Sequence, residues 1–164
     1  MRTTITSITI ILGLTSPAVL GGEAIRGDLA QLQGRWSATT GAKKQVQVVM
    51  TIQGRDVSVA IKTPTGTDIQ VTGELKLDES TSPRSLDWTK FTGPDEQPLP
   101  EVAAVYKVEG DTFTVCNGGF LGKRPREFKP GDGVFADVVV FRRLPSDKAA
   151  ATPAPGENSS IATR

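Results

Sequence analysis

Apolar and polar residues alternate with a period of two through the middle of the chain. The alternation is clearest over residues 46–52, where apolar positions interleave with Gln and Thr, and it returns over 57–62 and 69–77. Successive side chains of a strand point to opposite faces, so this pattern predicts half-buried β-strands. Eight strands are predicted, at 35–40, 46–52, 57–62, 69–77, 85–91, 102–108, 112–117 and 134–144.

The spacing of these strands predicts the fold class. Turn-forming residues separate most of them, and a hairpin is expected around Gly110. Residues 27–33 can form one or two helical turns, and no longer amphipathic helix is present. The chain is therefore all-β, with a single antiparallel barrel of about eight strands and a short N-terminal helix, although a sandwich also fits this spacing. Gly73 within a strand indicates a bulge or bend.

The two ends of the chain differ from its middle. Residues 1–24 contain the apolar run 8–14 and small residues at 21, 22 and 24, which is typical of a secretory signal peptide. An uncleaved anchor is the alternative, but Thr15–Pro17 interrupts the roughly 20 apolar residues that a spanning helix needs. Residues 145–164 are rich in Ala, Pro and Ser, which predicts a disordered tail. The domain then spans 25–144, and we expect export to a periplasm or the extracellular space.

The composition of the chain limits the kinds of partner and catalytic site that it can have. The 164 residues carry a net charge of +1, so no strong field favours nucleic acid or an anionic membrane. The chain has no His, which removes the commonest general base and transition-metal ligand. Cys116 is the single cysteine, and we expect it to be structural and half-buried. No catalytic residue, metal or cofactor is predicted.

Two motifs carry a resemblance to known families. Leu32-Gln33-Gly34-Arg35-Trp36 resembles the lipocalin and calycin signature, which implies that Trp36 closes the narrow end of the barrel and that Arg142 or Arg143 packs across it. The segments 28–36, 106–116, 124–128 and 140–143, in this order, resemble an uncharacterised small-domain family of planctomycete bacteria with a lipocalin-like fold. That resemblance covers about residues 28–144 and implies a shape without an activity.

The candidate binding residues fall into two groups. An inward-facing apolar set would line a ligand cavity or fill the interior; it comprises Met50, Val59, Val71, Leu75, Tyr106 and Phe113. A loop motif of Arg124, Pro125, Glu127 and Phe128 would clamp an anionic or peptide ligand at the rim or latch the loop.

Three classes of function remain open. The first is a monomeric, exported, non-enzymatic module that binds a small apolar molecule in the barrel or a peptide at its rim. The second is a solid-core structural or protein-interaction domain of the cell envelope. The third, a minor alternative, is an enzyme that uses carboxylates or Cys116.

Overall fold

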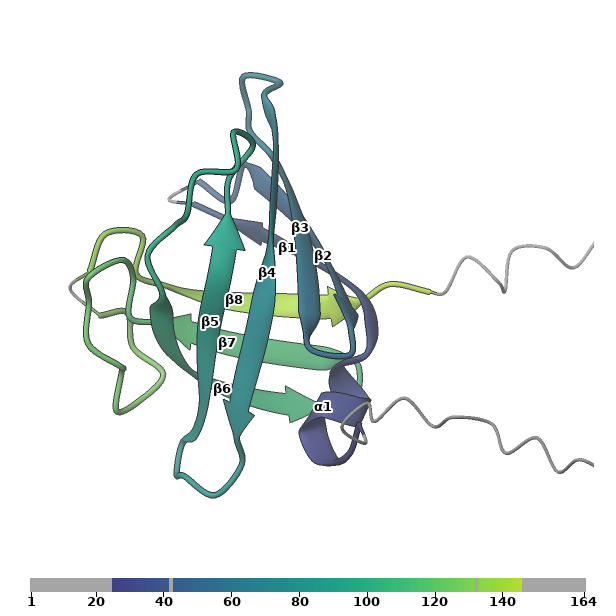
Figure 1. Cartoon of the computed structure of the whole chain (residues 1–164), viewed down its shortest axis with the longest axis vertical. Coiled ribbons are helices and arrows are strands. Elements are labelled where there is room, and N and C mark those ends of the chain that lie inside the picture. The colour runs from purple at the N-terminus through teal and green to yellow at the C-terminus, as the bar shows by residue number, and fades with distance from the viewer. Residues whose placement is uncertain (1–24, 42, 132, 146–164) are drawn as a thin grey trace, which may run out of the picture.

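A computed structural model describes residues 25–41, 43–131 and 133–145. The predicted signal peptide and nearly all of the predicted tail lie outside these residues. The described chain forms one closed antiparallel barrel in which each strand pairs with the next and β8 pairs with β1 (Figure 1). Its elements are α1 (Gly27–Leu32), β1 (Gly34–Thr40), β2 (Val46–Gln53), β3 (Asp56–Lys62), β4 (Asp68–Asp78), β5 (Arg84–Thr92), β6 (Val102–Glu109), β7 (Thr112–Asn117) and β8 (Asp137–Arg143).

The predicted fold class is confirmed, and only one strand boundary is clearly wrong. The last strand was expected to begin at residue 134, but β8 begins at Asp137. Phe135 has a φ of 62°, in the left-handed region that a strand residue does not adopt. The amide of Ala136 donates to the carbonyl of Gly133 and closes a turn there. The connection between β7 and β8 is therefore three residues longer than predicted.

The interior of the barrel is filled with side chains. Met50, Leu75, Tyr106 and Phe113, four of the predicted inward positions, belong to one core cluster together with Leu29 and Leu32 of α1. The largest side chains with almost no exposure are Trp36, Tyr106, Phe113, Leu32, Met50, Ile52, Leu75, Leu86, Val105, Val115 and Cys116. An eight-stranded barrel is narrow enough for its own side chains to fill it. Leu32 belongs to α1. The others face into the barrel, except Val105 and Cys116, which point outward from β6 and β7.

Gly73 marks a bulge in the sheet, as its position in the sequence indicated. The register between β4 and β5 shifts between Thr72 and Glu74, and the ring of Phe91 lies directly over the Cα of Gly73. A β-carbon at this position would overlap that ring. The absence of a side chain at Gly73 therefore makes room for an aromatic side chain from the neighbouring strand.

Gly73→Ala is expected to lower the free energy of unfolding by about 1–3 kcal/mol, because the added methyl overpacks the site. Gly93→Ala is the matched control, since the nearest atom to its β-carbon would be the Gln97 carbonyl oxygen at 3.9 Å. Its effect should stay within about 0.5 kcal/mol. Urea unfolding measures both. Equal losses in the two variants would contradict the steric explanation, as would a Phe91→Leu background that recovers none of the Gly73→Ala loss.

The two ends of the barrel have different structures. Helix α1 and the β2–β3, β4–β5 and β6–β7 turns lie at one end, while the β1–β2, β3–β4, β5–β6 and β7–β8 connections lie at the other. In Figure 1 the described chain begins beside α1 and ends, after β8, on the same side of the barrel. None of the helices described is long and apolar enough to cross a membrane. The end opposite α1 carries the connection between β7 and β8, the longest between two described strands.

Candidate functional site

Trp36 and Arg143 close the barrel beside α1. The indole of Trp36 is fully buried, and its Nε1–H donates to the carbonyl of Leu32 at 2.8 Å. The guanidinium of Arg143 lies 4.1 Å from the centroid of the Trp36 ring, in cation–π geometry. Arg143 also donates to the Gln33 carbonyl at 2.8 Å and to the carbonyl of Gln31. The two residues thereby fasten the helix to the first and last strands.

Arg142 points to the other face of β8. Its guanidinium donates to the hydroxyl of Thr112, and the side chain is exposed. The resemblance left Arg142 and Arg143 as alternatives for the closing arginine. The structure places Arg143 in that position, because Trp36 pairs with Arg143 in the register of β1 and β8.

A buried carboxylate on α1 forms a second contact with the barrel, which the sequence analysis did not single out. The carboxylate of Asp28 is 4% exposed and accepts hydrogen bonds from the hydroxyl of Tyr106, at 2.9 Å, and from the guanidinium of Arg84. The backbone amide of Asp28 donates to Glu79 at 2.9 Å. Burial, and then the hydrogen bond to Asp28, raises the pKa of Tyr106, and the bond to Asp28 raises the pKa of Arg84.

This cluster is well suited to hold α1 against the barrel. All the buried side-chain polar atoms of the described residues have hydrogen-bond partners, so the cluster leaves no orphaned group pointing at a ligand. Tyr106 lies 78 positions from Asp28 and Arg84 lies 56 positions away. No local sequence pattern connects residues at such separations, so the sequence carried no signal for this cluster.

The six predicted ligand-lining residues lie mostly in the packed core. Met50, Leu75, Tyr106 and Phe113 have almost no exposed surface. Phe113 contacts Trp36, Tyr106 and Phe141 through aromatic pairs. Val59 packs against this core, and Val71 lies opposite Val59 across β3 and β4, both half-buried. The four buried side chains therefore contact one another rather than line an open cavity.

The described parts of the connection between β7 and β8, residues 118–131 and 133–136, fold back along the outside of the barrel, and we call them the flap. Arg124 fixes it in place: its guanidinium donates to the carbonyls of Leu86, at 3.0 Å, and Ala104, at 2.6 Å, and pairs with Asp87. Four residues that point outward from the sheet are nevertheless buried; they are Ser85, Val105, Thr114 and Cys116. These contacts of Arg124 fasten the flap to β5 and β6, and we call them the latch.

The other loop-motif residues also face the outer surface. Glu127 pairs with Lys129 at 3.0 Å. The ring of Phe128 lies 6.0 Å from the ammonium of Lys107 on the outer face of β6. The thiol of Cys116 donates to the carbonyl of Lys129 at 3.0 Å, and burial raises its pKa. Cys116 is fully buried, where the sequence predicted half-burial, because the flap covers the outer face of its strand.

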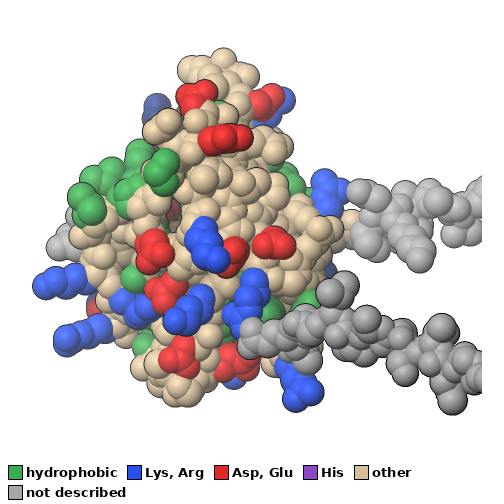
Figure 2. Space-filling model, in the orientation of Figure 1, with side chains coloured by type: hydrophobic (Ala, Val, Ile, Leu, Met, Phe, Trp, Pro, Cys, Tyr) green, Lys and Arg blue, Asp and Glu red, His purple; other side chains and the backbone are tan. Residues whose placement is uncertain are grey.

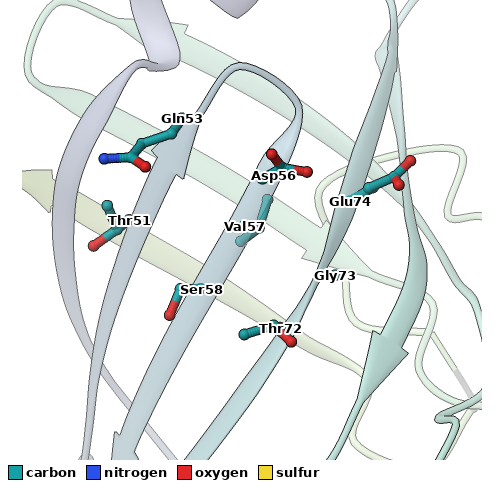
Figure 3. A pocket seen from close by; sticks show the side chains of 8 residues that line it. All are labelled: Thr51, Gln53, Asp56, Val57, Ser58, Thr72, Gly73 and Glu74. Carbon is teal, nitrogen blue, oxygen red and sulfur yellow. The ribbon is translucent and has the colours of Figure 1, made fainter.

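Two hollows lie on the outside of the barrel. The first, of about 310 Å³, crosses the outer face of β2, β3 and β4 (Figure 3). Its walls are short polar side chains such as Thr51, Ser58 and Thr72, which point away from the barrel interior in Figure 3. The carboxylates at its edge belong to Asp56 and Glu74, and Lys90 pairs with Glu74 at 2.9 Å. This hollow is shallow and polar, and the ion pair with Lys90 neutralises one of its two carboxylates.

The second hollow, of about 340 Å³, lies between the β4–β5 turn and the flap. Its lining combines hydroxyl groups, small apolar surfaces and two guanidinium groups; the residues are Thr81, Ser82, Pro83, Ser85, Val105, Arg124, Pro125 and Arg126. Arg124 is committed to backbone carbonyls and Asp87, as described above. Arg126 is exposed and forms no ion pair with another described residue. We call this hollow the flap hollow.

No set of three or more Cys, Asp or Glu side chains among the described residues is arranged to hold a metal ion. The chain matches no family model, no curated protein and no solved structure. The site is therefore described by its own geometry: a barrel closed at one end by Trp36, Arg143 and Asp28, and a latched flap with a cationic hollow on its outer face.

Proposed function

We propose that this chain is a non-enzymatic binding module that holds an acidic peptide segment in the flap hollow. The observation that carries the proposal is the exposed guanidinium of Arg126, which pairs with no other described residue, in a hollow lined with hydroxyl groups and small apolar surfaces. Arginine binds carboxylates through parallel N–H···O bonds, and hydroxyls satisfy the backbone groups of a bound peptide. The latch at Arg124 keeps this surface in place before a ligand arrives.

Because side chains fill the interior, a binding site on the surface fits the structure better than a small apolar ligand inside the barrel. Four of the six inward residues that would line such a cavity are buried against one another, and both hollows described lie outside. A solid-core interaction domain therefore fits the packing better than a carrier of small molecules. Native mass spectrometry of the purified protein tests the carrier alternative, which a co-purifying small molecule would favour.

A fluorescein-labelled oligoglutamate peptide is the probe for the flap hollow, with fluorescence polarisation as the measurement. Because charge-assisted hydrogen bonds contribute about 1.5–3 kcal/mol, Arg126→Glu is expected to weaken binding at least about tenfold. Arg142→Glu is the matched control, since it changes the net charge equally at an exposed arginine that lies on β8 rather than in the flap. Equal losses in both variants, or binding of an oligolysine peptide, would refute the site.

We also propose that the domain is a lipocalin-like barrel of the planctomycete family whose motifs it resembles, and that it is exported. The cation–π contact of Arg143 with Trp36 supports the first part, because it is the closure that the resemblance implied. The apolar run at residues 8–14 supports export, with the periplasm or the extracellular space as its destination and an envelope protein as the source of the acidic segment. N-terminal sequencing of the secreted protein tests export.

A further inference from the structure

The flap carries a cluster of exposed apolar side chains at its base, on the end of the barrel opposite α1. Leu121 is 93% exposed, Phe135 80% and Val134 60%. Phe120 pairs with Phe135 in edge-to-face geometry at 5.7 Å, and Phe120 and Val134 form a β-bridge, so the two limbs of the flap lie side by side there. We call Leu121, Val134 and Phe135 the apolar tip. Figure 2 shows hydrophobic side chains gathered at the left edge of the molecule, where Figure 1 places the flap.

The backbone holds this tip outward. Leu121 and Phe135 have φ angles of 59° and 62°, a region that bulky residues rarely adopt. The two limbs approach so closely that a β-carbon on Gly122 or Gly133 would overlap the carbonyl of Gly118. This close backbone packing and the two positive φ angles fix the course of the chain that carries the apolar tip.

Three exposed lysines lie in connections at the same end of the barrel as the apolar tip. Lys123 follows Leu121 by two positions and is exposed. On the other side, the hydroxyl of Thr40 at the end of β1 donates to Asp137, which brings the β1–β2 connection, with exposed Lys43 and Lys44, beside the start of β8. None of these lysines forms an ion pair with another described residue. The nearby carboxylate of Asp137 already accepts from Thr40 and from the Val138 amide.

We infer that the apolar tip inserts into the surface of a lipid bilayer that bears anionic headgroups, with Lys43, Lys44 and Lys123 contacting those headgroups. An exposed group of Leu, Val and Phe with exposed lysines at the same end of the barrel has the composition of an interfacial membrane contact. A second copy of the chain fits less well, because three side chains expose about 400 Å², half of the ~800 Å² per partner that a stable interface buries. The net charge of +1 does not oppose this contact, since the lysines act locally.

Vesicle binding tests the inference on the full chain. Vesicles of phosphatidylglycerol and phosphatidylcholine are expected to bind the protein more strongly than phosphatidylcholine alone. Phe135→Ser should weaken that binding about tenfold or more, because it removes a large inserted side chain. Lys123→Glu should weaken it at least about fivefold. Val140→Ser is the control, since Val140 is exposed on β8 outside the tip and should not affect binding.

A probe placed in the tip separates this contact from any binding by the apolar run at residues 8–14, which every variant retains. An environment-sensitive fluorophore on Val134→Cys is expected to shift to shorter wavelength on anionic vesicles, while the same fluorophore on Val140→Cys should not. An unshifted Val134 probe, or equal binding to vesicles without phosphatidylglycerol, would overturn the inference. So would a dimer in solution that Phe135→Ser dissociates, because the tip would then bind a second copy. The peptide assay depends on Arg126, which is not part of the apolar tip. The proposal of an acidic peptide ligand and the proposal of a membrane contact can therefore fail independently.

Discussion

Asp28→Ala is expected to lower the free energy of unfolding by about 2–4 kcal/mol, because it removes the buried acceptor that α1 presents to the barrel. The hydroxyl of Tyr106 loses its partner in a site that water does not reach, while Arg84, 46% exposed, can turn to solvent. Most of the loss therefore comes from Tyr106. Asp28→Asn retains an acceptor oxygen and should cost less than the alanine variant.

Asp111→Ala is the matched control for Asp28. Asp111 also pairs with an arginine at this end of the barrel, since Arg143 Nε lies 2.9 Å from its carboxylate, but its side chain is 81% exposed. Exposed pairs contribute about 0–1 kcal/mol, so this variant should be nearly as stable as the wild type. Urea unfolding of the two variants measures the difference. If the two losses were equal, burial of the Asp28 carboxylate would not be the cause.

Alkaline titration gives a second measurement of the same cluster. Tyr106 is the single tyrosine of the chain, so tyrosinate absorbance reports it alone. Its pKa is raised in the folded state, first by burial and then by the hydrogen bond to Asp28. The stabilisation is thus fully present below the unfolded value of about 10 and is lost as the pH rises above it. Tyrosinate should appear only as the barrel unfolds, and at a lower pH in Asp28→Ala.

Trp36→Ala should have the largest effect of any substitution considered, with an expected loss of about 3–5 kcal/mol. Trp36 has no exposed surface, pairs edge-to-face with Phe113 at 5.8 Å and lies under the guanidinium of Arg143. Its removal leaves a cavity at the closed end and removes the indole donor of the Leu32 carbonyl. Trp36→Phe keeps most of the packing and should lose less.

Trp88 provides the comparison within the same chain. It is half-buried, its Nε1–H donates to Asn117 at 2.9 Å, and it packs on the edge of the core. Trp88→Ala should therefore cost about 1–3 kcal/mol, less than Trp36→Ala. Chemical denaturation followed by far-ultraviolet circular dichroism measures both, because the tryptophan signal itself changes. A loss at Trp88 equal to that at Trp36 would show that the closed end is not the critical packing site.

The strands were predictable because period-two alternation is a local property of the chain. The range 46–52 agrees closely with β2, and Gly73 with the bulge between β4 and β5. The start of β8 was not predictable, since Val134 and Phe135 are good strand formers. Their backbone is instead determined by the turn at Gly133–Ala136 and by contact with Phe120 across the flap.

The same division applies to the site residues. The Gly-x-Trp motif correctly placed Trp36 at the start of the first strand, but only the register of β1 with β8 chose Arg143 over Arg142. The loop motif placed Arg124 in a connection. Its contacts to the Leu86 and Ala104 carbonyls come from two strands that are distant in the sequence.

By itself, the sequence determined an all-β chain of eight strands in order, a short leading helix and the alternating set that fills the core, because side-chain direction follows directly from position in a strand. Only the tertiary structure decided that the outward-pointing Val105 and Cys116 are buried, that Asp28 reaches Tyr106, and that Leu121 and Phe135 stay exposed. Each of these depends on how a connection or helix packs against distant strands, and the hydrophobicity of a residue does not specify which segment covers it.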